Sequence, residues 1–175
     1  MKEIIICVDK DDNEIGYIEK IDAHIKGVLH RALSIFIFND KNEVLLQKRY
    51  SGKYHSPSLW TNTCCTHPNK NESTIIAANR RLEEEMGFLC NLKEVFSFVY
   101  HVEFDNNLIE HEFDHVFFGR YNGDIKINPL EVEDYKWISL NEIIEDLKIN
   151  PNNYTFWFKY IIDNHIDEIK NNIDF

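Results

Sequence analysis

The chain has 175 residues, of which 43% are apolar and 13% aromatic, and its formal net charge is −11. This length is ordinary for one domain, and the apolar content is high enough to fill a core, which argues against disorder. The negative charge argues against a nucleic-acid surface, because such surfaces gather Lys and Arg. We therefore expect a single domain over residues 1–175 that binds no nucleic acid.

Neither a secretion signal nor a membrane span is evident in the sequence. The most apolar segment, Ala32 to Phe38, is far shorter than the roughly 20 residues that cross a bilayer. The four cysteines (Cys7, Cys64, Cys65 and Cys90) form no CxxC pair, so reduced thiols are expected. These features predict a cytoplasmic protein that does not bind a membrane.

Strand patterns fill the first third of the chain. Two β-rich runs between Ile4 and Ile18 predict a hairpin, and a connector that carries histidines follows from Lys20 to Arg31. Two buried strands are expected next, at Leu33–Phe38 and Val44–Arg49. A loop then leads to the extended segment Trp60–Cys65.

A helix is expected after Pro68. Apolar side chains recur at steps of three and four residues, at Ile75, Ala78, Leu82 and Met86, and Gly87 provides a stop signal.

Strands and helices also alternate in the second half. Two long strands, Lys93–Phe104 and Leu108–Tyr121, are expected around the turn Asp105–Asn107, and a third near Tyr135–Ile138. The run Ser139 to Glu142 is a capping box that starts a helix, and Tyr154 to Ile173 predicts the carboxyl-terminal helix. This order predicts an α+β fold with α/β/α layers.

The helical segment resembles the Nudix box, G-x5-E-x7-R-E-U-x-E-E-x-G-U, in which U is apolar. The matching residues are Glu72, Arg80, Leu82, Glu84, Glu85 and Gly87. Thr66 replaces the first Gly, and Arg81 replaces the Glu after Arg. Carboxylates suit Mg²⁺ or Mn²⁺, which in turn suit a diphosphate. A solvated helix face, on which Arg81 pairs with Glu84 and Glu85, is the simpler alternative.

The segment Trp60 to Pro68 is more specific. It resembles the W-T-N-x-x-C-x-H-P motif of type 1 isopentenyl-diphosphate isomerases, a branch of the Nudix superfamily. The resemblance extends from Lys20 to Trp157. It implies a Nudix fold with a mixed sheet, a Nudix-box helix and a carboxyl-terminal helix. It also explains Arg81, which removes a hydrolytic ligand and adds a phosphate contact.

The two adjacent cysteines should point to opposite faces of an extended segment, so only one can enter a given pocket. The motif identifies that one as Cys65. We expect Cys64 to be a small buried side chain. A cation or a metal near Cys65 would lower its thiol pKa and favour the thiolate.

A metal site is implied by the same resemblance. Glu110 and Glu112 lie two residues apart on a predicted strand and share a face. In the family such a pair joins three histidines around one divalent metal, Mn²⁺ or another. The corresponding histidines here are His24, His30 and His67, although the interval from His24 to His30 is one residue short. No ligand role is assigned to the other histidines, His55, His101, His111, His115 and His165.

The substrate implied is a prenyl diphosphate bound with Mg²⁺. Family cations that hold the diphosphate correspond to Lys20, Arg49, Lys53 and Arg81, and Glu85 would hold the Mg²⁺. Such local clustering would reconcile an anionic substrate with an acidic protein. Ordinary surface positions remain the alternative for the lysines. Whether Glu84 is an extra ligand, and whether the chain is a monomer or a weak dimer, stays open.

Four residues would perform the chemistry that the resemblance implies. Glu112, assisted by Tyr100, would protonate the terminal carbon of isopentenyl diphosphate, and Trp157 would stabilise the resulting tertiary carbocation. Cys65 would then remove a proton and give dimethylallyl diphosphate.

Two other functions remain possible interpretations of the same residues. A Nudix hydrolase of a nucleoside diphosphate derivative would use Glu84 and Glu85. A non-catalytic module would use the histidines and carboxylates to hold a structural metal only.

Overall fold

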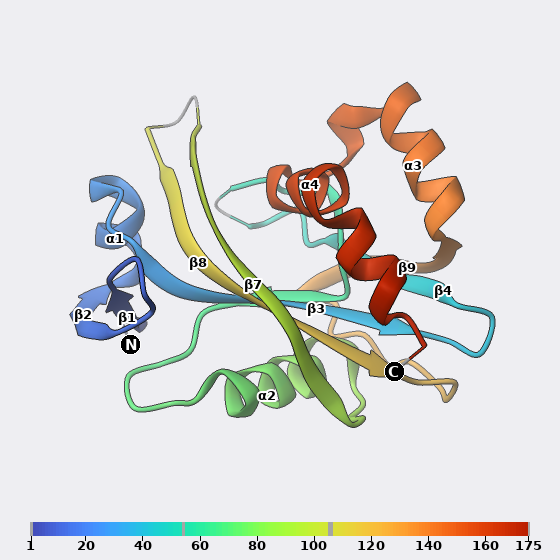
Figure 1. Cartoon of the computed structure of the whole chain (residues 1–175), viewed down its shortest axis with the longest axis horizontal. Helices are drawn as coiled ribbons and strands as arrows, with labels where there is room; N and C mark the ends of the chain where they lie inside the picture. The colour runs from blue at the N-terminus through green and yellow to red at the C-terminus, as the bar shows by residue number, and fades with distance from the viewer. Residues whose placement is uncertain (1, 54, 105–106, 175) are drawn as a thin grey trace.

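The computed structural model describes residues 2–53, 55–104 and 107–174, and a mixed β-sheet forms its centre (Figure 1). In these residues the sheet has nine strands: β1 (Ile4–Val8), β2 (Glu14–Glu19), β3 (His30–Phe38), β4 (Glu43–Arg49), β5 (Trp60–Thr61), β6 (Cys64–Thr66), β7 (Leu92–Glu103), β8 (Ile109–Arg120) and β9 (Val132–Ser139). The same residues form the helices α1 (Lys20–Lys26), α2 (Thr74–Met86), α3 (Leu140–Ile149), η1 (Pro151–Asn153) and α4 (Phe156–Asn172). The predicted α+β fold with a mixed sheet is confirmed.

Hydrophobic side chains cover both faces of the sheet, because successive residues of a strand point to opposite sides. Along β3, Leu33 and Ile37 pack in one cluster with Leu82 of α2. Phe36 belongs to a second cluster, together with Phe158 of α4. Helix α2 therefore covers one face, and α3 and α4 cover the other, which gives the predicted α/β/α layers (Figure 1).

Strand β3 joins distant parts of the sequence. It pairs in parallel with β8, where His30 lies opposite Glu112, and antiparallel with β6, where Ser34 lies opposite Cys65. On the other side of β8, Tyr100 of β7 lies opposite Glu112. Strand pairing alone thus brings together residues from the beginning, the middle and the second half of the chain.

The amino-terminal hairpin, β1 with β2, is confirmed. The predicted connector from Lys20 to Arg31 was incomplete, since its first part is helix α1. Seven residues are too few to display a 3.6-residue period in the sequence. The helix ends at Gly27, which has a left-handed φ of 63° and donates its N–H to the carbonyl of Ala23.

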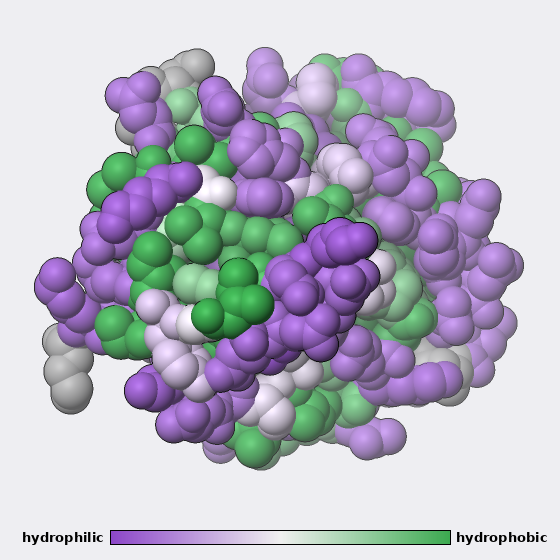
Figure 2. Space-filling view, turned by 60° about the vertical axis from the view of Figure 1, so that its left-hand side comes forward, coloured by the Kyte–Doolittle hydropathy of each residue, from purple (hydrophilic) through white to green (hydrophobic). Residues whose placement is uncertain are grey.

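The side of the molecule that carries α1 and the β1–β2 hairpin exposes both apolar and polar side chains. Ile15, Ile21 and Ile25 are exposed there. Figure 2, in which this side is turned forward, shows apolar side chains in the middle of the face and polar ones around them. None of the helices within the described ranges is both long and apolar enough to cross a membrane.

Helix α2 begins after Pro68 and ends before Gly87, as predicted. Gly87 adopts a φ of 75°, which ends the helix in the left-handed conformation. The N–H groups of Lys126 and Asn128 then donate to the carbonyls of Met86 and Glu85, at 3.1 and 2.9 Å. The segment that follows β8 therefore holds the last turn of the helix.

The strands predicted in the second half are also present. The turn expected at Asp105–Asn107 lies mostly outside the described residues, because Asp105 and Asn106 are not among them. The capping box is confirmed, since the Ser139 hydroxyl accepts from the N–H of Glu142, at 3.3 Å, and the Glu142 carboxylate accepts from the N–H of Ser139, at 3.1 Å. The carboxyl-terminal helix is present as α4.

Candidate active site

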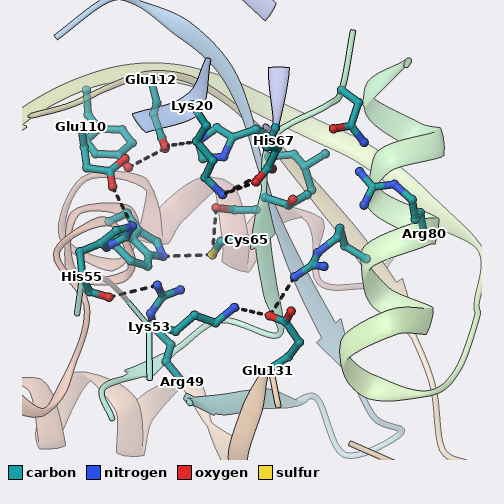
Figure 3. Close-up of a pocket in the computed structure, with 18 residues that line it drawn as sticks. Lys20, Arg49, Lys53, His55, Cys65, His67, Arg80, Glu110, Glu112 and Glu131 are labelled. Carbon is teal, nitrogen blue, oxygen red and sulfur yellow. Dashed lines mark hydrogen bonds and ion pairs between the residues drawn. The ribbon is translucent and has the colours of Figure 1, made fainter. Parts of the chain in front are cut away.

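A cavity of about 270 Å³ opens beside β6, β8 and the start of α4 (Figure 3). The structure brings all the predicted catalytic residues to this cavity, namely Cys65, Tyr100, Glu112 and Trp157. The predicted cations line it as well, namely Lys20, Arg49, Lys53 and Arg81. Their clustering agrees with the local concentration of positive charge expected from the sequence.

A buried group of five side chains could hold a metal ion. Its members are those that the resemblance implied: His24, His30, His67, Glu110 and Glu112. One ligand atom from each lies within 4.8 Å of all the others. The chain reverses at Gly27, between α1 and β3, and the ring centroids of His24 and His30 lie 5.0 Å apart across this reversal.

Backbone carbonyls orient two of these rings. Nδ1 of His24 lies 2.6 Å from the carbonyl oxygen of Lys20, and Nδ1 of His30 lies 2.7 Å from that of Val28. A carbonyl only accepts, so each Nδ1 carries the proton and each Nε2 is the basic nitrogen. In the part of the chain that the structure describes, Nε2 of His30 is buried and makes no hydrogen bond. These residues therefore fit a divalent metal ion.

The two carboxylates of the group differ in pKa. Burial, and then the charge of Glu112, raises the pKa of Glu110 well above its usual value. Burial also acts to raise the pKa of Glu112, but the nearby His30 ring and the hydrogen bond with His67 outweigh it and hold this pKa well below the usual value. Burial lowers the pKa of His67 to about 3. Neutral imidazole and ionised carboxylate are the forms that bind a metal.

Glu112 also contacts the predicted acid partner. The hydroxyl of Tyr100 donates to Oε2 of Glu112 at 2.6 Å, while Oε1 lies 2.8 Å from Nε2 of His67. Burial, followed by the charge of Glu112, raises the pKa of Tyr100 well above its usual value. Tyr100 is therefore a protonated hydrogen-bond donor at neutral pH.

The adjacent cysteines point to opposite sides, as predicted. Cys64 packs in the core beside Leu82, whereas Cys65 lines the cavity. The thiol of Cys65 donates to Oδ1 of Asn62 at 3.0 Å and accepts from Nε1 of Trp157 at 3.0 Å. Both contacts fix the position of the sulfur. Figure 3 shows the sulfur of Cys65 joined by a dashed line to a ring nitrogen.

The pKa of Cys65 in this structure does not favour the expected thiolate. Burial is the largest influence and, with the negative charge of Asp114, raises the thiol pKa to about 12. Arg49 acts in the opposite direction but offsets only part of the effect. The sequence argument counted the cations and missed the desolvation, which disfavours the charged form of a buried thiol. Cys65 is therefore a neutral thiol here.

Trp157 is held on several sides. Its indole N–H donates both to Cys65 and to the hydroxyl of Thr61, the latter at 2.9 Å. The guanidinium carbon of Arg49 lies 5.1 Å from the ring centroid, within the range of a cation–π contact. The indole is thus already in contact with a cation at this end of the cavity.

Each predicted cation has a polar partner in this structure. Lys20 lies 3.2 Å from Glu3, and Arg49 donates to the carbonyl oxygens of Ser56 and His55 at 3.1 and 3.2 Å. Lys53 pairs with Glu131. Arg81 contacts three carboxylates, those of Glu84, Glu85 and Glu131. Burial acts to lower the pKa of Arg81, but the three carboxylates have the larger effect and raise this pKa.

Glu85 lies outside the five-residue group. It is buried, pairs with Arg81 and accepts a hydrogen bond from Nε2 of Gln47 at 2.7 Å. The thiol of Cys64 also lies 3.5 Å from Oε2 of Glu85. A metal ion held by Glu85 would therefore be a second ion, separate from the one in the His/Glu group.

Sequence reasoning missed two residues that line the cavity, His55 and Glu131, and one that lies behind Cys65, Asp114. His55 received no role, yet its Nε2 lies 3.4 Å from Glu110 and its ring stands edge-on to Trp157. Asp114 accepts from Ser34 at 2.8 Å and acts on Cys65, and strand alternation after Glu110 and Glu112 could have indicated it. Glu131 carried no motif signal, because it stands alone after an irregular segment.

Known protein structures share this fold. A crystal structure of a Deinococcus radiodurans protein matches with a TM-score of 0.71 and 17% identity, over 85% of this chain and 90% of that chain. A MutT protein from Methanosarcina mazei matches with a TM-score of 0.66 and 22% identity, over 81% of this chain and 96% of that chain. At these identities the likeness shows the fold alone.

The sequence comparisons are more specific. The profile of the NUDIX domain matches residues 28–158. The chain is 55% identical over 162 residues to Isopentenyl-diphosphate Delta-isomerase 2 of Photorhabdus laumondii, covering 93% of this chain and 92% of that protein. It is 52% identical over 163 residues to Isopentenyl-diphosphate Delta-isomerase 1 of Aromatoleum aromaticum, with coverage of 93% and 92%. The chain therefore belongs to the isopentenyl-diphosphate Delta-isomerase family of NUDIX domain proteins.

Proposed function

We propose that this chain is an isomerase that interconverts isopentenyl diphosphate and dimethylallyl diphosphate, in isoprenoid biosynthesis. The observation that carries the proposal is the placement of two groups able to move protons, Cys65 and the Tyr100–Glu112 pair, in one cavity. The same cavity is lined by the four cations that suit a diphosphate. The names of the relatives support the same reaction.

The metal requirement follows from the donor sets. His24, His30, His67, Glu110 and Glu112 would hold Mn²⁺ or another divalent ion, which would fix Glu112 and favour its ionised form. Glu85 would hold Mg²⁺ that arrives with the diphosphate, because hard carboxylate and phosphate oxygens suit this ion. Lys20, Arg49, Lys53 and Arg81 would bind the diphosphate oxygens.

The forward reaction moves one proton in and another out. Glu112, with Tyr100 hydrogen-bonded to it, delivers a proton to the terminal carbon of isopentenyl diphosphate, and the double-bond electrons form the new C–H bond. A tertiary carbocation results, beside the indole of Trp157. Cys65 as thiolate removes a proton from the carbon next to the cationic centre, and the C–H electrons form the new double bond.

The pKa shifts of the two proton-transfer groups favour the protonation states that the forward reaction would leave behind. Glu112 has a pKa well below its usual value and is ionised, while Cys65 has a pKa of about 12 and is protonated. These states suit the reverse reaction, in which Cys65 donates and Glu112 accepts. Each forward turnover then requires that the proton on Cys65 be exchanged for one on Glu112.

Hydrolysis of a nucleoside diphosphate derivative is less well supported. A hydrolytic Nudix helix needs several carboxylates gathered around metal ions, whereas here the guanidinium of Arg81 contacts both Glu84 and Glu85. A purely structural metal is also less well supported, because it leaves Cys65 and the cations of the cavity without a role.

The broader properties remain predictions. We propose one domain over residues 1–175, a small-molecule prenyl diphosphate as the ligand, and a cytoplasmic location without nucleic-acid or membrane binding. The formal charge of −11 supports the prediction for nucleic acid.

The proposal is tested by proton NMR of isopentenyl diphosphate in deuterated water with Mg²⁺ and metal-loaded protein. We expect wild type to form deuterated dimethylallyl diphosphate, and Cys65→Ala to form none. Cys90→Ala is the matched control, because Cys90 is a free, partly exposed cysteine outside the cavity, and it should behave as wild type. Unchanged substrate with folded wild type, or release of inorganic phosphate, would contradict the isomerase.

A further inference from the structure

Glu131 lies between the two cations at one end of the cavity, and neither the fold nor the proposed reaction gives it a role. Its Oε2 atom is 3.2 Å from Nη2 of Arg81, and the same oxygen pairs with Nζ of Lys53. Figure 3 shows the carboxylate lying between the side chain of Lys53 and a second nitrogen-bearing side chain. A single carboxylate oxygen therefore bridges two groups that would receive a diphosphate.

The backbone holds Glu131 firmly in this place. Its N–H donates to the carbonyl of Asn128 at 2.9 Å, and its carbonyl accepts from the N–H of Tyr50 at 3.1 Å. Asn128 in turn donates its N–H to the carbonyl of Glu85, in the last turn of α2. Glu131 is thus tied both to the segment that precedes Lys53 and to the helix that carries Arg81.

The carboxylate is ionised at neutral pH. Burial acts to raise the pKa of Glu131, but the hydrogen bond and charge of Lys53, together with Arg81, outweigh it and lower the pKa. Arg81 also contacts Glu84 and Glu85, so the positive charge at this end of the cavity is largely neutralised before any ligand binds. An anion can use Lys53 and Arg81 only if it competes with these carboxylates.

We propose that Glu131 makes the cavity selective for a diphosphate over a monophosphate by occupying Lys53 and Arg81 until a ligand displaces it. The inference rests on the proposed function and names a residue that determines its substrate class. A diphosphate carries more charge than a monophosphate and is long enough to contact both cations at once, so it can replace both ion pairs. A monophosphate replaces them incompletely and is rejected.

The substitution Glu131→Gln distinguishes a carboxylate that competes with the ligand from one that only holds Lys53 and Arg81 in position. If Glu131 competes with the ligand, the neutral amide should release Lys53 and Arg81 and strengthen anion binding. If Glu131 only holds the two cations in place, the same change should weaken binding, because the long side chain of Lys53 loses its fixed position. The sign of the change in affinity therefore decides between the two.

The experiment is calorimetric titration of the metal-loaded protein with inorganic phosphate, and with inorganic diphosphate plus Mg²⁺. In Glu131→Gln we expect diphosphate to bind about threefold to tenfold tighter, and phosphate to gain more, so that the ratio of the two affinities falls. The control is Glu133→Gln, two residues along the same segment, where the carboxylate pairs with Lys48 outside the cavity. Its affinities should equal those of wild type.

Weaker or unchanged binding of both anions by folded Glu131→Gln would overturn the proposal, as would wild type that binds phosphate and diphosphate equally. Thermal unfolding of each variant checks that it is folded. The titrations need no turnover, so they separate this inference from the isomerase proposal. A wild type that prefers diphosphate, loses that preference in Glu131→Gln and yet does not isomerise would support the inference and contradict the reaction.

Discussion

Proton transfer at the Tyr100–Glu112 pair depends on one hydroxyl group. Tyr100 donates at 2.6 Å to the oxygen of Glu112 that does not contact His67. It is 3% exposed, so removal of the hydroxyl leaves that oxygen in a dry environment without its donor. The residue therefore affects the acid directly and has little reason to affect diphosphate binding at the other end of the cavity.

Tyr100→Phe should lower kcat by about 100-fold while KM for isopentenyl diphosphate changes little, since positioned acid–base groups contribute roughly 10²–10⁴-fold to rate. Steady-state kinetics with the metal-loaded protein measure both constants. Tyr160→Phe is the control, because that ring lies 5.8 Å from the ring of Tyr100 but does not line the cavity. A kcat for Tyr100→Phe equal to that of wild type would show that Glu112 works without the hydroxyl.

The chemistry of single residues was only partly predictable from the sequence. Motif position was enough to choose Cys65 over Cys64, because strand alternation allows only one of them into the cavity. The pKa of Cys65 was predicted in the wrong direction, because desolvation depends on side chains that the fold brings from distant segments. Asp114, whose negative charge also raises the pKa of Cys65, lies on β8.

At the level of elements, periodic segments were predicted well and short ones poorly. Helix α2 has 13 residues and repeats its apolar positions over three turns, whereas α1 has only seven residues and shows no such pattern. Strands β5 and β6 contain two and three residues and are defined by their pairing with β4 and β3. Elements of this size depend on tertiary contacts that no local pattern contains.

The two helix ends that frame the site offer a matched test of backbone strain. Gly27 ends α1 with a φ of 63°, and Gly87 ends α2 with a φ of 75°. A Cβ at Gly27 would lie 3.1 Å from side-chain atoms of Ile109, which can move. A Cβ at Gly87 would lie 2.4 Å from the backbone oxygen of Lys126, a residue whose N–H is bonded to the carbonyl of Met86 in the last turn of α2.

Gly27→Ala should therefore lower the free energy of unfolding by about 1–2 kcal/mol, the usual cost of a left-handed residue with a Cβ. Gly87→Ala should lower it by roughly a further 1–3 kcal/mol, because a close contact with backbone is added. Urea unfolding of both variants gives the two values. Equal losses would contradict the role assigned to the Lys126 carbonyl.

For the whole molecule, the sequence predicted the α/β/α layers but not how tightly the site is buried. The apolar runs of β3 and the helical period of α2 determine which faces pack together. His55 approaches Glu110 only because the segment after β4 folds back over the sheet, supported by the two hydrogen bonds that Arg49 donates to its carbonyls. A fold-back of this kind has no periodic signature.

Burial of neutral histidines makes the stability of the metal-free protein dependent on pH. Burial lowers the pKa of His67 to about 3 and that of His55 to about 2, whereas an unfolded histidine has a pKa near 6.5. Below about pH 6.5 the unfolded chain binds protons that the folded chain does not, so stability falls as the pH falls. The loss of stability continues as the pH falls to the pKa values of the folded protein, and it is absent well above about pH 6.5, where the histidines are neutral in both states.

Between about pH 7.5 and pH 5.5, each of these two histidines should lower the free energy of unfolding by roughly 1 kcal/mol. Urea unfolding of the chelator-treated protein at the two pH values measures the loss. His67→Asn and His55→Asn should each show a smaller pH dependence than wild type, whatever their absolute stability. His101→Asn should keep the wild-type dependence, because His101 is exposed on β7 and does not line the cavity. A wild-type stability that stays constant or rises as the pH falls would mean that these rings take up protons in the folded protein.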